Sequence, residues 1–200
     1  MEKAVIGRNE FFEIVENELG TEDRERIEWA YSLAKNYHRP QKRENGDNYF
    51  AHCQAVALIS FKFPPTCPSE IILCLLHDVY EDQFVPRGMI RRLFGERLDE
   101  GLRTLSDCKP FYGTRAMIEK VDKSKEEYYK ILMEAPLIVR RVKLADRLHN
   151  LQTLHQCPPD KIKRKIFETL KRIIPLAEIT NDKFLNAIKQ ECKKYSVMFE

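Results

Sequence analysis

The sequence predicts an all-α protein, a single-domain helical bundle, and three observations support this fold class. Apolar residues recur at the spacing of amphipathic helices along most of the chain, and no segment shows the alternation of a strand. The chain has 7 glycines, fewer than a β-rich architecture with many tight turns usually needs. Its 200 residues suit one domain with a continuous core, and 43% of them are hydrophobic.

The segments with helical periodicity are separated by caps and helix breakers. They span residues 9–19, 21–37, 49–61, 68–82, 87–94, 96–105, 125–133, 137–154, 160–174 and 181–194. Acidic residues after Thr21 favour the start of the second helix, because negative charge is stabilised at a helix N-terminus. Pro40 follows the end of this helix, and Pro64 with Pro65 follows the end of the third. Pro175 interrupts the chain between the last two helices.

The helix predicted over residues 68–82 has two unlike halves. Pro68 suits a first helical turn, and residues 71–76 are all apolar, so we expect this half to be buried on every face. The second half, residues 77–82, is rich in ionisable groups and must therefore emerge into a cavity. Residues 106–124 form a long loop before helical periodicity resumes.

Charge and cysteine content exclude several classes of protein. Lysine and arginine total 34 against 31 acidic residues, with the signs interspersed, so we expect no surface for a nucleic acid polymer. The 6 cysteines include no C-x-x-C pair, which favours reduced thiols in a cytosol over a zinc ribbon or a disulfide framework. The N-terminal segment is too acidic for a signal peptide, and no apolar run approaches the roughly 20 residues that span a bilayer. We therefore expect a cytoplasmic protein with no membrane partner.

A cluster of ionisable residues follows the apolar segment 71–76. On a continuous helix His77 and Glu81 would be neighbours one turn apart, and so would Asp78 and Asp82. Leaving such groups unpaired in the interior would cost roughly several kcal/mol, so a bound cation is a suitable partner. Imidazole nitrogen and carboxylate oxygen together suit Mn, Fe, Co or Zn better than Ca.

Further ligands must come from other segments of the chain. His52 lies in the first turn of the helix over 49–61, and Asp146 lies on the helix over 137–154. Asp146, with Lys143 before it and Asn150 one turn after it, forms a polar stripe on an otherwise apolar helix. Taken singly, a histidine or an acidic residue is more often structural or solvated than a ligand, so the prediction depends on the combination.

Three motifs together resemble a known family. Y-F-A-H ends at His52, L-L-H-D-V-Y-E-D spans residues 75–82, and V-K-L-A-D-R-L-H-N-L-Q-T-L spans residues 142–154. In this order they resemble the HD-domain metal-dependent phosphohydrolases, and among them the guanosine tetraphosphate hydrolase domain of Rel/SpoT enzymes and their stand-alone Mesh1-like relatives. The resemblance covers about residues 27–177. It implies an HD-domain helical bundle, with an N-terminal helical extension over residues 1–20 and the hydrolase domain over residues 21–200.

The resemblance also implies a site. The implied ligands of one Mn²⁺ ion are His52, His77, Asp78 and Asp146. Glu81 and Asp82 match the catalytic pair that acts on the attacking water and the leaving group. The residues expected to bind substrate or to support the site are Lys42, Arg43, Lys109, Arg147 and Asn150. Such an ion would lower the pKa of water, which a neighbouring carboxylate could orient or deprotonate.

The activity implied is Mn²⁺-dependent hydrolysis of the 3′-pyrophosphate of guanosine tetra- or pentaphosphate (ppGpp or pppGpp), which gives GDP or GTP and pyrophosphate. A guanine nucleotide alarmone would then be the small-molecule partner, and whether the chain forms a homo-oligomer stays open. Because roughly 20 residues follow the last matched helix, we expect no synthetase activity. Two alternatives stay open: a phosphatase acting on another nucleotide, such as NADPH, at the same metal site, and a catalytically silent nucleotide-binding module.

Overall fold

A computed structural model describes residues 6–86, 88–107 and 123–196, and every regular element in these ranges is helical. The α-helices are α1 (Arg8–Leu19), α2 (Arg24–Tyr37), α3 (Tyr49–Phe61), α4 (Pro68–Leu76), α5 (Val79–Asp82), α6 (Met89–Phe94), α7 (Glu96–Leu105), α8 (Lys125–Glu134), α9 (Leu137–Gln152), α10 (Pro159–Glu168), α11 (Ile174–Glu178) and α12 (Asp182–Lys193). A 3₁₀ turn, η1 (Leu154–Gln156), follows α9, and a π-helical turn, η2 (Thr169–Ile173), joins α10 to α11. The predicted all-α fold class is confirmed. Within the described ranges no helix is long and apolar enough to cross a membrane.

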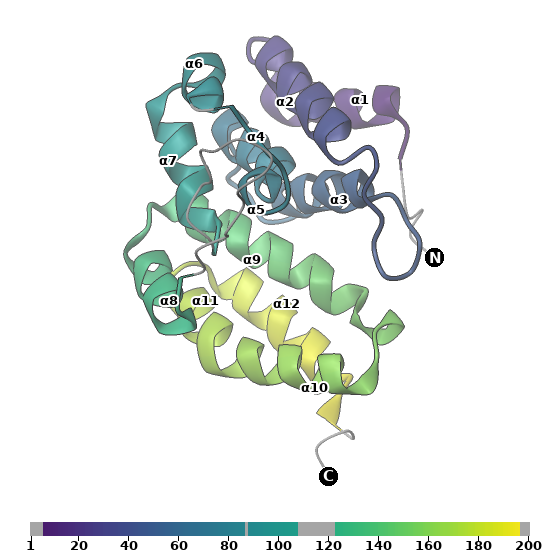
Figure 1. The fold of residues 1–200 in the computed structure, drawn as a ribbon, viewed down its shortest axis with the longest axis vertical. Coiled ribbons are helices and arrows are strands. Elements are labelled where there is room, and N and C mark those ends of the chain that lie inside the picture. The colour runs from purple at the N-terminus through teal and green to yellow at the C-terminus, as the bar shows by residue number, and fades with distance from the viewer. Residues whose placement is uncertain (1–5, 87, 108–122, 197–200) are drawn as a thin grey trace.

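Helix α9 runs through the middle of the molecule, and the other helices lie around it (Figure 1). α3 and α4 pack against α9 and against each other, and α2 packs on α4. α12 packs against α9 as well, and in Figure 1 it lies with α10 and α11 in the lower half of the molecule. The three helices that carry the predicted metal ligands, α3, α4 and α9, are therefore mutually in contact.

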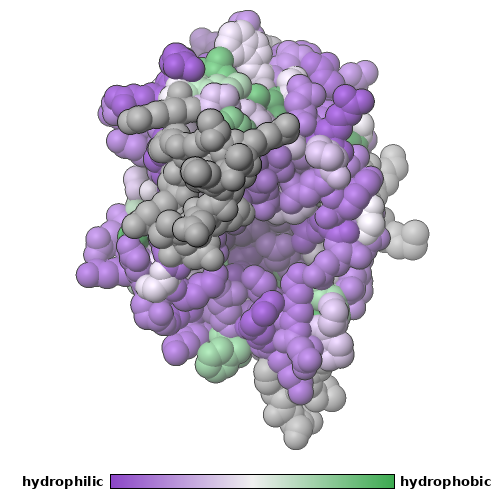
Figure 2. Space-filling view, in the orientation of Figure 1, coloured by the Kyte–Doolittle hydropathy of each residue, from purple (hydrophilic) through white to green (hydrophobic). Residues whose placement is uncertain are grey.

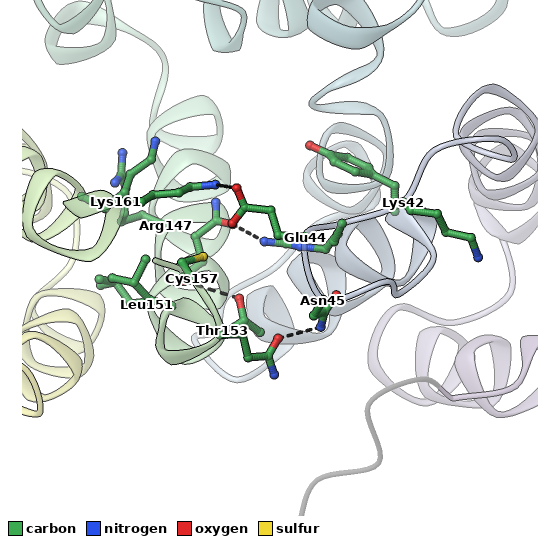
Figure 3. Close-up of a pocket in the computed structure, with 14 residues that line it drawn as sticks. Lys42, Glu44, Asn45, Arg147, Leu151, Thr153, Cys157 and Lys161 are labelled. Atoms are coloured by element: carbon green, nitrogen blue, oxygen red, sulfur yellow. Dashed lines mark hydrogen bonds and ion pairs between the residues drawn. The ribbon is translucent and has the colours of Figure 1, made fainter. Parts of the chain in front are cut away.

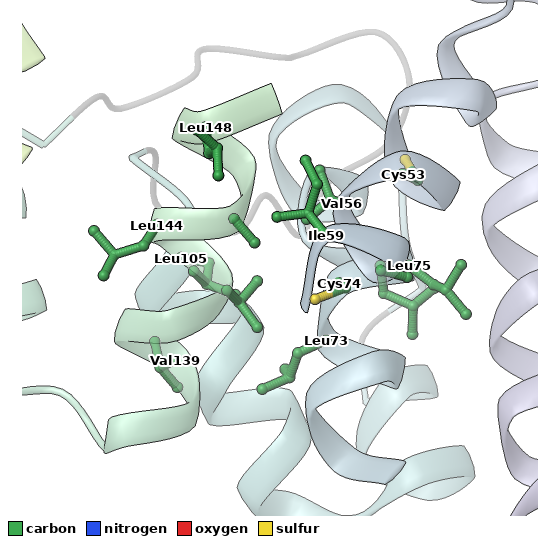
Figure 4. Close-up of a cluster of buried hydrophobic side chains, with 14 of the residues drawn as sticks. Cys53, Val56, Ile59, Leu73, Cys74, Leu75, Leu105, Val139, Leu144 and Leu148 are labelled. Carbon is green, nitrogen blue, oxygen red and sulfur yellow. The ribbon is translucent and has the colours of Figure 1, made fainter. Parts of the chain in front are cut away.

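The core is built around α4. All six residues from Ile71 to Leu76 are fully buried, which confirms the expectation that this segment faces the core on every side. Figure 4 shows Leu73 and Cys74 of α4 near side chains of α3 and α9, among them Val56 and Leu144. Each buried aliphatic side chain of this kind contributes roughly 1.5 to 3 kcal/mol, so this contact supplies much of the stability of the fold.

Gly101 permits α7 to approach α4 and α9 closely. A methyl group at this position would lie 3.1 Å from Leu73 Cδ2 and 3.4 Å from Val139 Cγ2. These distances leave little room for any larger side chain. The contact fixes α7, whose end leads to the segment around Asp107.

The continuous helix predicted over residues 68–82 is interrupted. α4 ends at Leu76, and α5 begins at Val79, after a turn formed by His77 and Asp78. Consecutive residues on one helix point about 100° apart, which would keep the two side chains from meeting at one point. At this turn the two side chains nevertheless meet, and Asp78 Oδ2 lies 2.9 Å from His77 Nε2.

Other helix boundaries also differ from the prediction. α2 begins at Arg24, because residues 21–23 form a turn before it. Pro175 does not end the helical path after α10. The π turn η2 precedes it, and Pro175 lies in the first turn of α11, where a missing backbone N–H is tolerated.

A buried ion pair links α4 to α9 at the end remote from His77. Arg141 Nε lies 2.9 Å from Glu70 Oε2 and 3.0 Å from Glu70 Oε1, and both side chains are buried. Arg141 Nη2 also donates to the carbonyl of Phe63 at 2.6 Å, and the Ser60 hydroxyl donates to Glu70. Both charges are therefore compensated inside the protein.

Replacing one partner of this pair will destabilise the fold. In Glu70→Gln the Arg141 charge stays buried without a counter-charge, so we expect the free energy of unfolding to fall by about 3 kcal/mol or more. Urea denaturation followed by circular dichroism measures this change. Glu100→Gln, at an exposed position on α7, is the matched control and will shift the midpoint little. Equal midpoints for the two variants would refute the structural role of the pair.

Candidate metal centre and catalytic cleft

Two histidines face each other at the junction of α3 and α4. His52 is in the first turn of α3, His77 follows the last residue of α4, and their Nε2 atoms lie 3.2 Å apart in the interior. Asp146 of α9 places its Oδ1 atom 3.3 Å from His52 Nε2 and 3.7 Å from His77 Nε2. The donor atoms of these three residues all lie within 4.8 Å of one another, which makes them a candidate metal-binding group.

Asp78 joins this group from the turn between α4 and α5. Its Oδ2 atom is 2.9 Å from His77 Nε2 and 3.6 Å from His52 Nε2. The hydroxyl of Tyr49 donates to the same oxygen at 2.7 Å, which fixes the carboxylate. The structure thus brings together all four residues that the sequence predicts as metal ligands.

The chemistry of these donors fits a divalent transition metal. His77 Nδ1 lies 2.8 Å from the carbonyl of Cys74 and must donate to it, so Nε2 of a neutral His77 presents a lone pair to the cluster. Lone pairs and carboxylate oxygens repel one another unless a cation lies among them. Two ligands bound about 2.1 Å from one ion lie about 3.0 to 3.4 Å apart, close to the spacing of the donors in this cluster.

The electrostatics of the cluster also favour a positive charge among its donor atoms. Burial alone would lower the pKa of His77, but the carboxylates of Asp78 and Asp146 raise it to about 9. Burial likewise opposes ionisation of Asp146, yet Lys143 and the two histidines hold its pKa well below the usual range. Both carboxylates are therefore available as anionic ligands.

His149 is a member of the site that sequence reasoning missed. Its Nδ1 atom lies 2.7 Å from Nδ1 of His52, on the side of the ring away from the cluster. Burial, with the nearby His52, lowers the pKa of His149 to about 3, so this ring is neutral. The contact orients His52 and leaves its Nε2 facing the cluster. His149 lies three residues after Asp146 in the same motif. Residues at this spacing share a helix face, so the sequence could have indicated that His149 lies near the site.

The polar stripe on α9 holds Asp146 in place. Lys143 Nζ lies 3.1 Å from Asp146 Oδ2, and Asn150 Nδ2 donates to Asp146 Oδ1 at 2.6 Å. Asn150 Oδ1 in turn accepts from Arg43 Nη2 at 2.8 Å. The stripe therefore connects the candidate metal centre to the loop between α2 and α3.

The side chains of Glu81 and Asp82 lie in different environments. Glu81 Oε1 accepts a hydrogen bond from the backbone N–H of Asp107 at 2.7 Å, and burial, with the charge of Asp78, raises its pKa to about 7. Glu81 lines a cavity of about 180 Å³ together with His52, Asp78 and Asp146; we call this the metal cavity. Asp82 is exposed, and its Oδ2 accepts from Gln41 Nε2 at 2.7 Å.

A second cavity, of about 280 Å³, adjoins the first and carries an excess of positive charge; we call it the basic cavity. Its cations are Lys42, Arg43, Arg147, Lys161 and Lys165. Figure 3 shows Lys161 directed toward Glu44, and their charged atoms are 2.7 Å apart. The residues that line both cavities are Tyr49, Arg147, Asn150 and Lys165. The face in Figure 2 is hollowed near its centre, and hydrophilic side chains surround the hollow.

The predicted substrate-binding residues are placed as follows. Lys42 is exposed and lines the basic cavity, and Arg43 has a buried Nη1 atom that has no hydrogen-bond partner in the described part of the chain. Arg147 is buried and pairs with Glu168 at 3.2 Å, while it lines both cavities. Asn150 lies between the cavities, whereas Lys109 lies outside the described residues.

Comparisons with known proteins agree with this geometry. A family model described as "HD domain" matches residues 30–178. The GTP pyrophosphokinase of Streptomyces coelicolor is 36% identical over 168 residues, which cover 82% of this chain and 18% of that protein. The "Bifunctional (p)ppGpp synthase/hydrolase SpoT" of Escherichia coli K12 is 32% identical over 170 residues, 82% of this chain and 23% of that protein. The chain therefore spans about a fifth of the length of these relatives.

A solved structure has the same fold. It is described as "A metazoan ortholog of SpoT hydrolyzes ppGpp and plays a role in starvation responses", and it matches with a TM-score of 0.69 at 20% sequence identity. The match covers 86% of this chain and 96% of that one. At this identity the match establishes the fold, in agreement with the helical architecture in Figure 1.

Binding of a divalent cation will stabilise the protein. With Mn²⁺ at about 100 times its dissociation constant, the stabilisation is about 2.7 kcal/mol, which raises the unfolding midpoint by roughly 5 to 10 °C in a domain of this size. Thermal unfolding with and without Mn²⁺ measures the shift. His77→Asn will lose it, and His155→Asn, at an exposed histidine, will keep it. A shift that persists in His77→Asn would mean that the ion binds elsewhere.

Proposed function

Because the chain belongs to the HD-domain family, we propose that it hydrolyses the 3′-pyrophosphate of guanosine tetra- or pentaphosphate, with GDP or GTP and pyrophosphate as products. The junction of the two cavities at Asn150 supports this proposal most strongly. Asn150 bonds to Asp146 on the metal side and to Arg43 on the basic side. A nucleotide bound in the basic cavity could thus extend a phosphate chain into the metal cavity. SpoT is described as a (p)ppGpp synthase/hydrolase, and its metazoan ortholog is described as hydrolysing ppGpp.

We assign substrate binding to the basic cavity. Lys42, Arg43 and Lys161 supply charge for phosphate oxygens, and a guanidinium can also stack on a purine ring. Arg147 and Asn150, which line both cavities, are assigned to the part of the substrate that crosses between them. Lys109 stays a prediction from the sequence resemblance.

The residues that would hold the metal are His52, His77, Asp78 and Asp146, and we propose one Mn²⁺ ion. A set of two imidazoles and two carboxylates suits this borderline ion better than Ca²⁺. When bound, the ion would neutralise phosphate charge and lower the pKa of water. The supporting contacts of His149, Lys143 and Tyr49 hold the ligand side chains in position before any ion or substrate arrives.

The proposed reaction cleaves one phosphorus–oxygen bond. The oxygen of water adds to the phosphorus that carries the ribose 3′ oxygen while one of its protons passes to Glu81, the bond to that 3′ oxygen breaks, and the 3′ oxygen takes a proton from a solvent water beside Asp82. Glu81 is assigned to orient the water and accept its proton, because it lines the metal cavity and the Asp107 amide fixes it. Asp82, which lines neither cavity, is assigned to the leaving-group side because it matches the second residue of the catalytic pair in the resembling motif.

We also propose a domain assignment and a location. The hydrolase domain spans residues 21–200, and residues 1–20 form an extension in which α1 packs on α2 through Phe11, Phe12 and Tyr31. All the cysteines in the described part of the chain are free thiols, which supports a reducing, cytoplasmic location. We propose that this chain performs hydrolysis without synthesis; incubation with GTP and ATP will then give no alarmone.

Pyrophosphate release from guanosine tetraphosphate tests the proposed activity. Purified protein with Mn²⁺ will release pyrophosphate and GDP in equal amounts, and a chelator will stop the reaction. His77→Ala will lower the rate at least about 100-fold because it removes a proposed ligand, and His155→Ala will not.

A panel of nucleotides, including NADPH, separates the proposal from its alternatives. Faster release of phosphate from NADPH than of pyrophosphate from the alarmone would favour another phosphatase. Nucleotide binding with no turnover on any substrate would favour a catalytically silent module.

A further inference from the structure

We propose that Gln41 and His38 are positioning residues that fix the carboxylate of Asp82 for the reaction. This inference rests on the proposed function, in which Asp82 acts on the leaving group. Gln41 and His38 lie in the segment between α2 and α3, about forty residues before Asp82 in the sequence. Like Asp82, neither residue lines the metal cavity or the basic cavity, and we assign both a supporting role behind the Asp82 carboxylate.

The polarity of the hydrogen bonds leaves one arrangement for these three side chains. Oδ2 of Asp82 accepts the hydrogen bond at 2.7 Å, and the atom of Gln41 that faces it is the amide nitrogen, which donates. Gln41 Oε1 then faces His38 Nδ1 at 2.7 Å, which must carry the ring proton and donate it. Oε1 accepts a second bond from Gln83 Nε2 at 3.0 Å. The Gln41 amide is therefore held on both sides, and a flip would lose its bond to the Asp82 carboxylate.

His38 anchors this chain in the interior. It has no solvent exposure, and its ring stacks on Tyr49 with 4.8 Å between centroids and 24° between planes. The Tyr49 hydroxyl donates to Asp78 at 2.7 Å. One buried ring thus supports two carboxylates, Asp82 through Gln41 and Asp78 through Tyr49.

The backbone around Gln41 is fixed as well. Its N–H donates to the carbonyl of His38 at 3.0 Å, and its carbonyl accepts from the N–H of Tyr49 at 3.1 Å. An isolated antiparallel bridge between Lys42 and Asn48 continues this pairing. The loop is therefore fastened to the first turn of α3, the same turn that carries His52.

Without the Gln41 amide, the exposed side chain of Asp82 would lose the one side-chain hydrogen bond that the described residues give it. Its carboxylate would then sample several rotamers, and few of them would face the leaving group. Loss of a group that orients a catalytic side chain lowers turnover and leaves substrate binding intact. The expected signature is a fall in kcat with KM unchanged.

Gln41→Met tests the proposal, because methionine has a similar length and no amide. With guanosine tetraphosphate and Mn²⁺, we expect kcat to fall about 10- to 100-fold, while KM and the Mn²⁺ concentration for half-maximal rate change less than about twofold. Gln190→Met, at an exposed position on α12, is the matched control and will keep the wild-type kcat. Thermal unfolding of each variant verifies that it is folded at the assay temperature.

Substitutions of His38 test whether it acts through Gln41. His38→Asn keeps an N–H donor near the position of Nδ1, whereas His38→Phe keeps only an aromatic ring. We expect His38→Asn to retain more of the wild-type kcat than His38→Phe. The double variant His38→Phe with Gln41→Met will have about the same kcat as Gln41→Met alone, because both changes break the same series of hydrogen bonds from His38 to Asp82.

The possible results separate this inference from the proposed function. If the wild type hydrolyses the alarmone and Gln41→Met has the same kcat, the role of Gln41 is refuted and the proposed function is not. A fall in kcat with a parallel rise in the Mn²⁺ requirement would also overturn it, since the residue would then support the metal centre. No turnover by the wild type on any nucleotide of the panel would overturn the function, and the role of Gln41 with it.

Discussion

Six consecutive residues of α4 are excluded from water, and the chain then places an imidazole and a carboxylate at the end of that helix. Ionisable groups at such a point must be compensated, because unpaired charge in the interior costs more than a domain of this size can tolerate. His52 on α3 and Asp146 on α9 converge on His77 and Asp78, and together they form a site where a divalent cation would compensate the negative charge. The contacts that pack α3, α4 and α9 together therefore also determine the geometry of the site.

Neighbouring groups fix the orientation of three of the four candidate ligands. The carbonyl of Cys74 fixes His77, His149 fixes His52, and Asn150 with Lys143 fixes Asp146. These contacts are buried or partly buried, where water weakens hydrogen bonds less than at the surface. Asn150 extends the same network to Arg43, so binding of an anion in the basic cavity and the position of a ligand carboxylate are physically linked.

Local patterns in the sequence sufficed to predict most of the helices and the burial of residues 71–76, because each of these is encoded by neighbours on one helix. The set of four candidate ligands came instead from the resemblance of three separate motifs to a known family. Contacts between distant segments were not predictable in this way. The pair of Glu70 with Arg141, the contact of His149 with His52 and the bond of Gln41 to Asp82 each join side chains from separate segments. The turn at residues 77–78 was also missed, since it is favoured by convergence on a shared centre and not by any helix breaker.

Pulsed electron paramagnetic resonance of the Mn²⁺-loaded protein tests the central claim, that two imidazoles and two carboxylates hold one divalent ion, most directly. Nitrogen nuclei of coordinated imidazole couple to the electron spin of Mn²⁺, and carboxylate oxygens give no such signal. We expect one tightly bound ion per chain with couplings from two imidazole nitrogens, of which one is lost in His52→Asn. A tightly bound ion without nitrogen coupling, or couplings that His52→Asn leaves unchanged, would contradict it.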